Sequence, residues 1–124
     1  MAAWNGPPAP DESGMIVVDG FNTFLSNHPD LARSPIRAAA EFVRLKDPRA
    51  LTTRIVGQAP QLESPDEVRV LLTEDGLADD SVRAVRFALQ FRRTGARWRL
   101  DSARRLQRCQ PGRGHQRFSP KPCQ

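Results

Sequence analysis

Residues 82–93, VRAVRFALQFRR, carry the pattern that decides the fold. Large apolar residues stand at every second position of this stretch, and small or polar residues stand between them. The apolar set is Val85, Phe87, Leu89 and Phe91, and the intervening set is Ala84, Arg86, Ala88 and Gln90. Because successive side chains of a strand point to opposite faces, the stretch predicts a long strand with one face in the core and the other in solvent.

The sequence on either side predicts partners for this strand in an antiparallel sheet. Thr94-Gly95 predicts a tight turn, in which glycine adopts a positive φ without strain. The chain then returns in a strand at 96–108 that faces Trp98 and Leu100 inward. The same alternation predicts two earlier strands, at 51–59 and 67–74, and hence a sheet of about four strands.

Residues 15–28 predict an amphipathic helix before the sheet. Val18, Phe21 and Leu25 recur at the spacing of one helix face. Pro29 ends this helix, because the residue before a proline disfavours the helical backbone conformation.

A second predicted helix has clearer boundaries. Ser34 is a natural N-cap, Pro35 suits the first helical position, and Asp47-Pro48 closes the helix. The order of elements indicates an α+β fold, in which two N-terminal helices pack on one face of a curved antiparallel sheet of about four strands.

The chain has 124 residues, 39% of them hydrophobic, enough for one domain with its own core. We expect residues 1–14 to be a flexible, proline-rich leader or linker, residues 15–108 the domain, and residues 109–124 a basic C-terminal loop. Residues 1–14 lack the basic and apolar regions of a signal peptide. The protein is therefore either cytoplasmic or exported through a leader or anchor that is absent from this chain. We expect no membrane span, since no apolar run is long enough.

Two cysteines, Cys109 and Cys123, bracket the polar C-terminal segment CQPGRGHQRFSPKPC. An even pair in a polar segment predicts a disulfide, and with it a secreted or cell-envelope location. Free thiols are one alternative, and a metal bound by Cys109, His115 and Cys123 is another. The spacing differs from that of structural zinc sites, so we expect no metal and no other cofactor.

Positive charge gathers at the C-terminal end of the chain. Residues 92–124 hold ten basic residues and one acidic residue, whereas residues 1–91 hold nine basic residues and thirteen acidic residues. The predicted contacts to an anionic partner are Arg104, Arg105, Arg108, Arg113 and Arg117. A solvated basic edge is the alternative. Residues 111–115, PGRGH, either cradle an anion or form the tight turns of a disulfide loop.

The order of helices and then long antiparallel strands ending in RWRLDSA, at 97–103, resembles the cone-shaped domains of the nuclear-transport-factor-two-like superfamily. That superfamily includes ketosteroid isomerases, scytalone dehydratase and polyketide cyclases of the SnoaL type, together with extracytoplasmic accessory domains. The string RCQPGRGHQ, at 108–116, is similar to the end of small actinobacterial and cyanobacterial proteins, and it implies no activity. The superfamily implies an apolar cavity, whose lining we assign to Phe21, Val43, Phe87 and Leu89.

Enzymes of this superfamily use carboxylates and histidines that point into the cavity. The candidates of these types are Asp19, His28, Glu41 and Asp101. Asp19 and His28 are the least unfavourable acid–base pair. Both have a structural explanation as well: Asp19 would lie on the solvent side of the predicted helix, and His28 would end that helix before Pro29. The chain has no tyrosine for an oxyanion donor, and it has no nucleotide-binding or hydrolase motif.

We therefore expect a non-catalytic binding or accessory domain, extracytoplasmic if the disulfide forms. We expect it to bind either an anionic partner or a small apolar ligand. The sequence leaves the oligomeric state undecided between a monomer and an assembly such as a homodimer. One alternative is an isomerase or lyase that acts on a small molecule in the cone cavity. Another is a binder of nucleic acid or acidic polymer through the basic C-terminal end.

Overall fold

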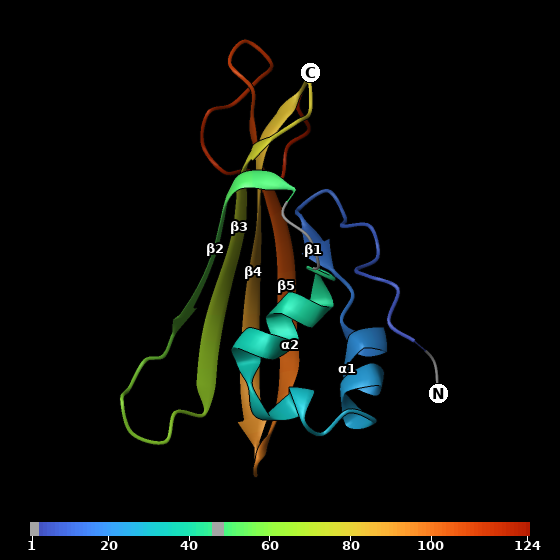
Figure 1. The fold of residues 1–124 in the computed structure, drawn as a ribbon, viewed down its shortest axis with the longest axis vertical. Helices are drawn as coiled ribbons and strands as arrows, with labels where there is room; N and C mark the ends of the chain where they lie inside the picture. The colour runs from blue at the N-terminus through green and yellow to red at the C-terminus, as the bar shows by residue number, and fades with distance from the viewer. Residues whose placement is uncertain (1–2, 46–48) are drawn as a thin grey trace.

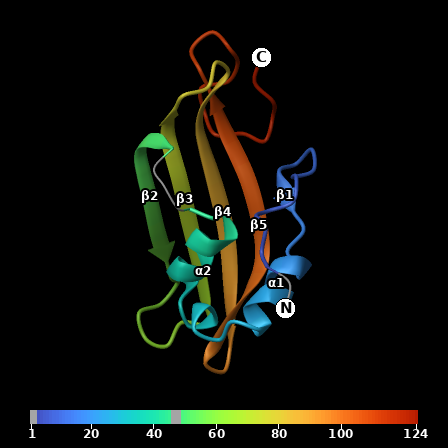
Figure 2. The same cartoon turned by 45° about the vertical axis from the view of Figure 1, so that its right-hand side comes forward.

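The computed structural model describes residues 3–45 and 49–124. These residues contain two α-helices and one five-stranded antiparallel sheet of order β1-β5-β4-β3-β2. The strands are β1 (Met15–Ile16), β2 (Ala50–Gln58), β3 (Glu67–Leu77), β4 (Val82–Thr94) and β5 (Arg97–Cys109). The helices are α1 (Asp19–Ser26) and α2 (Pro35–Phe42), with a 3-10 turn at Leu31–Arg33 between them. Both helices lie on one face of the curved sheet, which confirms the α+β class (Figure 1, Figure 2).

The hairpin of β4 and β5 forms the middle of the sheet. Thr94 pairs with Arg97, so only Gly95 and Ala96 form the turn, and Gly95 has a φ of 64°. This positive φ is the conformation that two-residue hairpin turns require and that glycine adopts without strain. The hairpin residues buried beneath the helices are Phe87, Leu89, Phe91, Trp98 and Leu100. The predicted strand, its buried face and its turn are confirmed.

The opposite face of the sheet, which no helix of the described residues covers, is called the open face below. Its side chains alternate with the buried ones along each strand. They include Arg54 on β2, Thr73 on β3, Arg86 on β4 and Arg108 on β5. An antiparallel sheet with one packed and one solvated face is the arrangement that the alternation predicts.

The segment 15–28 differs from the single helix that its spacing predicts. Met15–Ile16 pairs with β5 and forms β1, and α1 begins only at Asp19. Ile16 is buried in the core whereas Val17 is 68% exposed, the alternation of a strand end. The edge of β5 offers backbone partners that a sequence pattern does not reveal. The sheet therefore has five strands instead of about four.

The second helix begins where the sequence predicts. The Ser34 hydroxyl accepts a hydrogen bond from the Arg37 N–H at 3.2 Å, and Pro35 is the first helical residue. The helix ends at Phe42, and the predicted closing pair Asp47-Pro48 lies outside the described residues. The residues that α2 buries against the sheet are Ala38, Ala39 and Phe42.

The segment 3–14, expected to be a flexible leader or linker, lies along the domain and contributes to its core. The Trp4 indole N–H donates to the Phe42 carbonyl at 2.7 Å. Its ring centroid lies 5.0 Å from that of Phe21 and 5.6 Å from that of Phe42. Asp11 orders the following turn by accepting hydrogen bonds from the N–H groups of Ser13 and Met15. An aromatic anchor of this kind holds an irregular segment without regular secondary structure.

We expect Trp4→Ala to lower the free energy of unfolding by about 2 kcal/mol, since the change removes a large partly buried ring and its hydrogen bond. Urea denaturation measures the effect. Val17→Ala is the control, because its exposed side chain should change stability by less than about 0.5 kcal/mol. Equal stability of the two variants would show that the segment does not dock on the core.

Candidate functional site

The C-terminal tail, residues 110–124, is tied to the end of the sheet. Cys109 and Cys123 form a disulfide, as predicted. Ser119 exchanges two backbone hydrogen bonds with Gln107, at 2.9 and 3.0 Å, and the Gln107 side chain donates to the Lys121 carbonyl at 2.7 Å. The tail therefore folds back on β5 near the loop that joins β3 to β4 (Figure 1).

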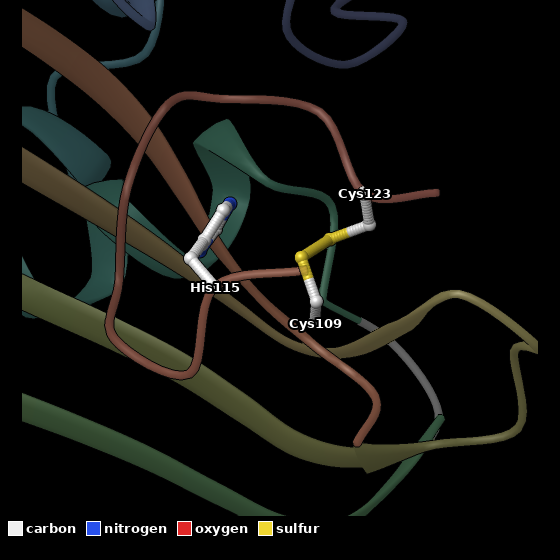
Figure 3. Close-up of side chains that lie close together, drawn as sticks. All are labelled: Cys109, His115 and Cys123. Atoms are coloured by element: carbon white, nitrogen blue, oxygen red, sulfur yellow. A yellow bond between two sulfur atoms is a disulfide. The ribbon is translucent and has the colours of Figure 1, made fainter. Parts of the chain in front are cut away.

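His115 lies beside the disulfide (Figure 3), with one of its ring nitrogens and both sulfurs within 4.8 Å of one another. The sulfurs are bonded to each other, so they have no thiolate to offer a metal. The two ring nitrogens of His115 lie 2.8 Å from the Arg117 carbonyl and 2.9 Å from the Lys121 carbonyl. With the disulfide formed, the bond and the His115 contacts stabilise the loop, and the three residues do not constitute a metal site.

Gly114 is the residue at which the tail passes closest to the disulfide. Its φ is 138°, and a Cβ added there would lie 2.9 Å from the sulfur of Cys109. Both the backbone conformation and the space therefore require glycine. This supports the turn-forming interpretation of residues 111–115.

The five predicted anion-contact arginines do not form one surface. Strand alternation puts Arg104 and Arg108 on the open face and Arg105 on the face beneath the helices. Arg104 donates to the Ser13 carbonyl at 2.8 Å, which binds it to the N-terminal segment. Arg113 and Arg117 are exposed in the tail.

A cavity of about 300 Å³ opens between α2, the N-terminal segment and the sheet; we call it the Glu74 cavity. Its lining residues are Pro7, Val43, Arg49, Glu74, Leu77, Val85, Phe87 and Arg105. Glu74 is only 3% exposed. One carboxylate oxygen lies 3.1 Å from Arg49 Nη2, and the other, Oε2, is buried without a hydrogen-bond partner among the described residues. An unpaired buried oxygen of this kind costs stability.

Arg105 and Arg49 are the two positively charged residues that line the Glu74 cavity. Arg105 is held by a neighbouring side chain. Its Nη1 donates to the Gln107 side chain at 2.9 Å. Burial lowers the pKa of Arg105 below its ordinary value, although the guanidinium stays protonated. The cavity thus combines an apolar floor, one acceptor oxygen without a partner among the described residues, and a half-buried donor group.

Sequence reasoning missed Glu74, although a signal was present. Val68, Val70 and Leu72 share one face of β3, and the same period of two puts Glu74 on that face. A carboxylate that continues an apolar stripe is a candidate for function. Among the predicted lining residues, Val43 and Phe87 do line this cavity, whereas Phe21 and Leu89 are fully buried in the core.

The acid–base candidates do not come together. Asp19 lines a different cavity, of about 530 Å³, between α1 and the β4–β5 turn, and His28 is absent from its lining. The His28 ring stacks on Phe24 at 4.0 Å, and its Nδ1 lies 2.8 Å from the Phe24 carbonyl. Asp101 lies 3.8 Å from Arg92, and Glu41 is half-buried on α2.

A third hollow, of about 470 Å³, lies on the open face, and we call it the open-face groove. Its lining residues are Thr52, Arg54, Val56, Gln58, Leu71, Thr73, Asp75, Arg86, Arg108 and Phe118. Phe118 comes from the tail, and the guanidinium carbons of Arg86 and Arg108 lie 4.1 and 5.4 Å from its ring centroid. Phe118 therefore packs the tail against two arginines of the open face.

No protein-family model, curated protein or solved structure matches the chain. The resemblance to the nuclear-transport-factor-two-like superfamily therefore stays a prediction.

Removing the disulfide by Cys109→Ala with Cys123→Ala should lower the free energy of unfolding by about 3 kcal/mol, since it frees a loop of about 15 residues in the unfolded chain. Urea denaturation measures this change. The intact mass of the native protein should be two hydrogens below that of the reduced protein. Alkylation of both cysteines without reductant would contradict the disulfide.

The Asp75–Arg108 pair makes stability depend on pH. Burial alone would raise the pKa of Asp75, but the hydrogen bond and positive charge of Arg108 outweigh it, so the pKa lies below its ordinary value. A carboxyl with a lowered folded-state pKa stabilises the fold above its ordinary pKa of about 4, and this contribution is lost as the pH falls through the folded value.

We therefore expect Asp75→Asn to be less stable than wild type by at most about 1 kcal/mol near neutral pH, since the pair is partly exposed. The two proteins should converge only as the pH falls below the lowered folded-state pKa of Asp75, where the aspartic acid is protonated and both side chains are uncharged at this position. Denaturation across this pH range measures the difference. Asp80→Asn, at an exposed position, is the control and should follow wild type throughout; a gap that persists at low pH would contradict the ion-pair explanation.

Proposed function

We propose that this protein is a non-catalytic binding domain whose Glu74 cavity holds a small amphipathic ligand. The single observation that carries the proposal is the buried Oε2 atom of Glu74, which has no partner among the described residues and lines a cavity. A domain retains such a destabilising group where a ligand completes its hydrogen bonding.

The lining defines the chemical class of the ligand. Val43, Leu77, Val85 and Phe87 offer an apolar floor. Glu74 needs a hydrogen-bond donor, and Arg105 offers donors to an acceptor. A short carbon chain that ends in a group with both a donor and an acceptor, such as an amide, fits this set. The volume of about 300 Å³ lies at the small end of ligand pockets.

The charged groups around Glu74 support binding over catalysis. Its ionisable neighbours in the cavity are two arginines, Arg49 and Arg105. Arginine side chains do not serve as proton donors or acceptors for catalysis near neutral pH. Among the described residues, neither histidine lines this cavity. General acid–base catalysis needs a second group that changes its protonation state.

The disulfide supports an extracytoplasmic location as part of the proposal, because structural disulfides persist in oxidising compartments. In the described part of the chain, no helix is long and apolar enough to cross a membrane.

Glu74→Leu tests the proposal. We expect the free energy of unfolding to rise by about 1 kcal/mol, because the change removes a buried oxygen without a partner. Hexanamide should shift the NMR signals of the Arg105 side chain and the Val85 amide in wild type, and this response should be absent in the variant.

Glu67→Leu is the matched control, since it makes the same change on the same strand but on the open face, where Glu67 pairs with Arg92 at 3.0 Å. It should leave the hexanamide response intact. Lower stability of Glu74→Leu together with an unchanged response would show that Glu74 is a structural partner of Arg49 and that the cavity does not use it.

A further inference from the structure

The open-face groove holds two arginines whose charge no acidic group of the described residues balances. Of the three arginines that line it, Arg108 pairs with Asp75 at 2.7 Å, and the same carboxylate lies 3.5 Å from Arg83. Arg54 and Arg86 form no ion pair within the described part of the chain. The middle of the groove therefore carries excess positive charge.

Strand register brings these two arginines to either side of one small residue. Arg54 is the partner of Thr73 across β2 and β3, and Thr73 is the partner of Arg86 across β3 and β4. Neighbouring strands lie about 4.8 Å apart, so the two arginine Cα atoms are separated by about 10 Å with only the threonine side chain between them. Two long guanidinium side chains in this arrangement can reach a single anion.

Arg86 is held in place for such a contact. Its Nε donates to the Thr73 hydroxyl at 2.9 Å, and its guanidinium stacks on the Phe118 ring. Its two terminal nitrogens make no hydrogen bond with the described residues. Burial and the positive charges of Arg108, Arg54 and Arg69 lower the pKa of Arg86 below its ordinary value, and an anion in the groove would relieve that repulsion.

We propose that the open-face groove binds a small organic phosphate monoester, with the phosphate between Arg54 and Arg86. A phosphate dianion balances the two unpaired cations, and the guanidinium fork matches its oxygens. The groove, at about 470 Å³, has room for a carbon skeleton beside the phosphate, and Val56 and Leu71 offer that skeleton an apolar surface. A second copy of the chain fits this face poorly, because it would set arginine against arginine.

This site is separate from the Glu74 cavity, which lies on the other face of the sheet, and it stands whether or not that cavity binds a ligand. Its key residues also differ from the basic C-terminal cluster of the sequence: Arg54 and Arg86 precede that cluster, and only Arg108 belongs to both.

Calorimetric titration with phenyl phosphate at low salt tests the proposal. We expect Arg86→Gln and Arg54→Gln each to weaken binding roughly tenfold, as the loss of a charge-assisted hydrogen bond implies. Asp75→Asn should tighten binding several-fold, since it releases the charge of Arg108. The matched control is Arg92→Gln, on the same strand and face as Arg86 but already paired with Glu67 and Asp101. Its affinity should stay within about twofold of wild type.

Three results would overturn the proposal. An equal loss in Arg92→Gln would show that binding follows only the overall charge of the face. Retention on heparin with no response to phenyl phosphate would make the face a polymer-binding surface. If inorganic phosphate binds as tightly as phenyl phosphate, the carbon skeleton contributes nothing to affinity, and the proposed contact of that skeleton with Val56 and Leu71 is wrong. Should Arg86→Gln fail to fold, Arg54→Gln still decides, because Arg54 is exposed.

Discussion

The antiparallel pairing of β4 with β5 is the constraint on which the rest of the molecule depends. The Gly95-Ala96 turn joins two strands of 13 residues each and sets their register near the turn, with irregularities at Gln90/Phe91 and Val82/Ala84. Because side chains alternate, that register decides which residues meet the helices and which meet solvent. The other strands add to the edges of this hairpin, both helices pack on one of its faces, and the tail folds back at its far end (Figure 2).

Each face of the sheet holds a charged side chain in unfavourable surroundings, acidic on one face and basic on the other. Beneath the helices, Glu74 continues an otherwise apolar stripe and leaves one oxygen without a partner among the described residues. On the open face, Arg86 lies among like charges. Glu74 pairs with Arg49 through one oxygen but leaves the other buried and unsatisfied, and Arg86 has no ion pair among the described residues, so both depart from the rule that buried polar atoms and crowded charges find partners. Such exceptions gather at functional sites. A ligand that supplies the missing hydrogen bond or counter-charge binds through an interaction that the free protein lacks.

The tail connects the disulfide to the open face. Cys109 is the last residue of β5, and the bond to Cys123 brings the intervening residues back over the strand. The backbone pairing of Gln107 with Ser119 sets Phe118 against Arg86 and Arg108. The disulfide therefore stabilises more than a loop: it keeps an aromatic ring under two guanidinium groups, which limits their freedom and prepares them for an anion.

The sequence by itself determined the features that depend on neighbours in the chain. The alternation in 82–93, the glycine turn, the Ser34 cap with Pro35, and the cysteine pair all state local requirements, and each is present in the structure. The tertiary structure alone decided which distant segments meet. It made a strand of Met15–Ile16, docked Trp4 on the core, left Glu74 without a full set of partners and aligned Arg54 with Arg86. These outcomes follow from strand order and register between segments far apart in the chain, which no local pattern encodes.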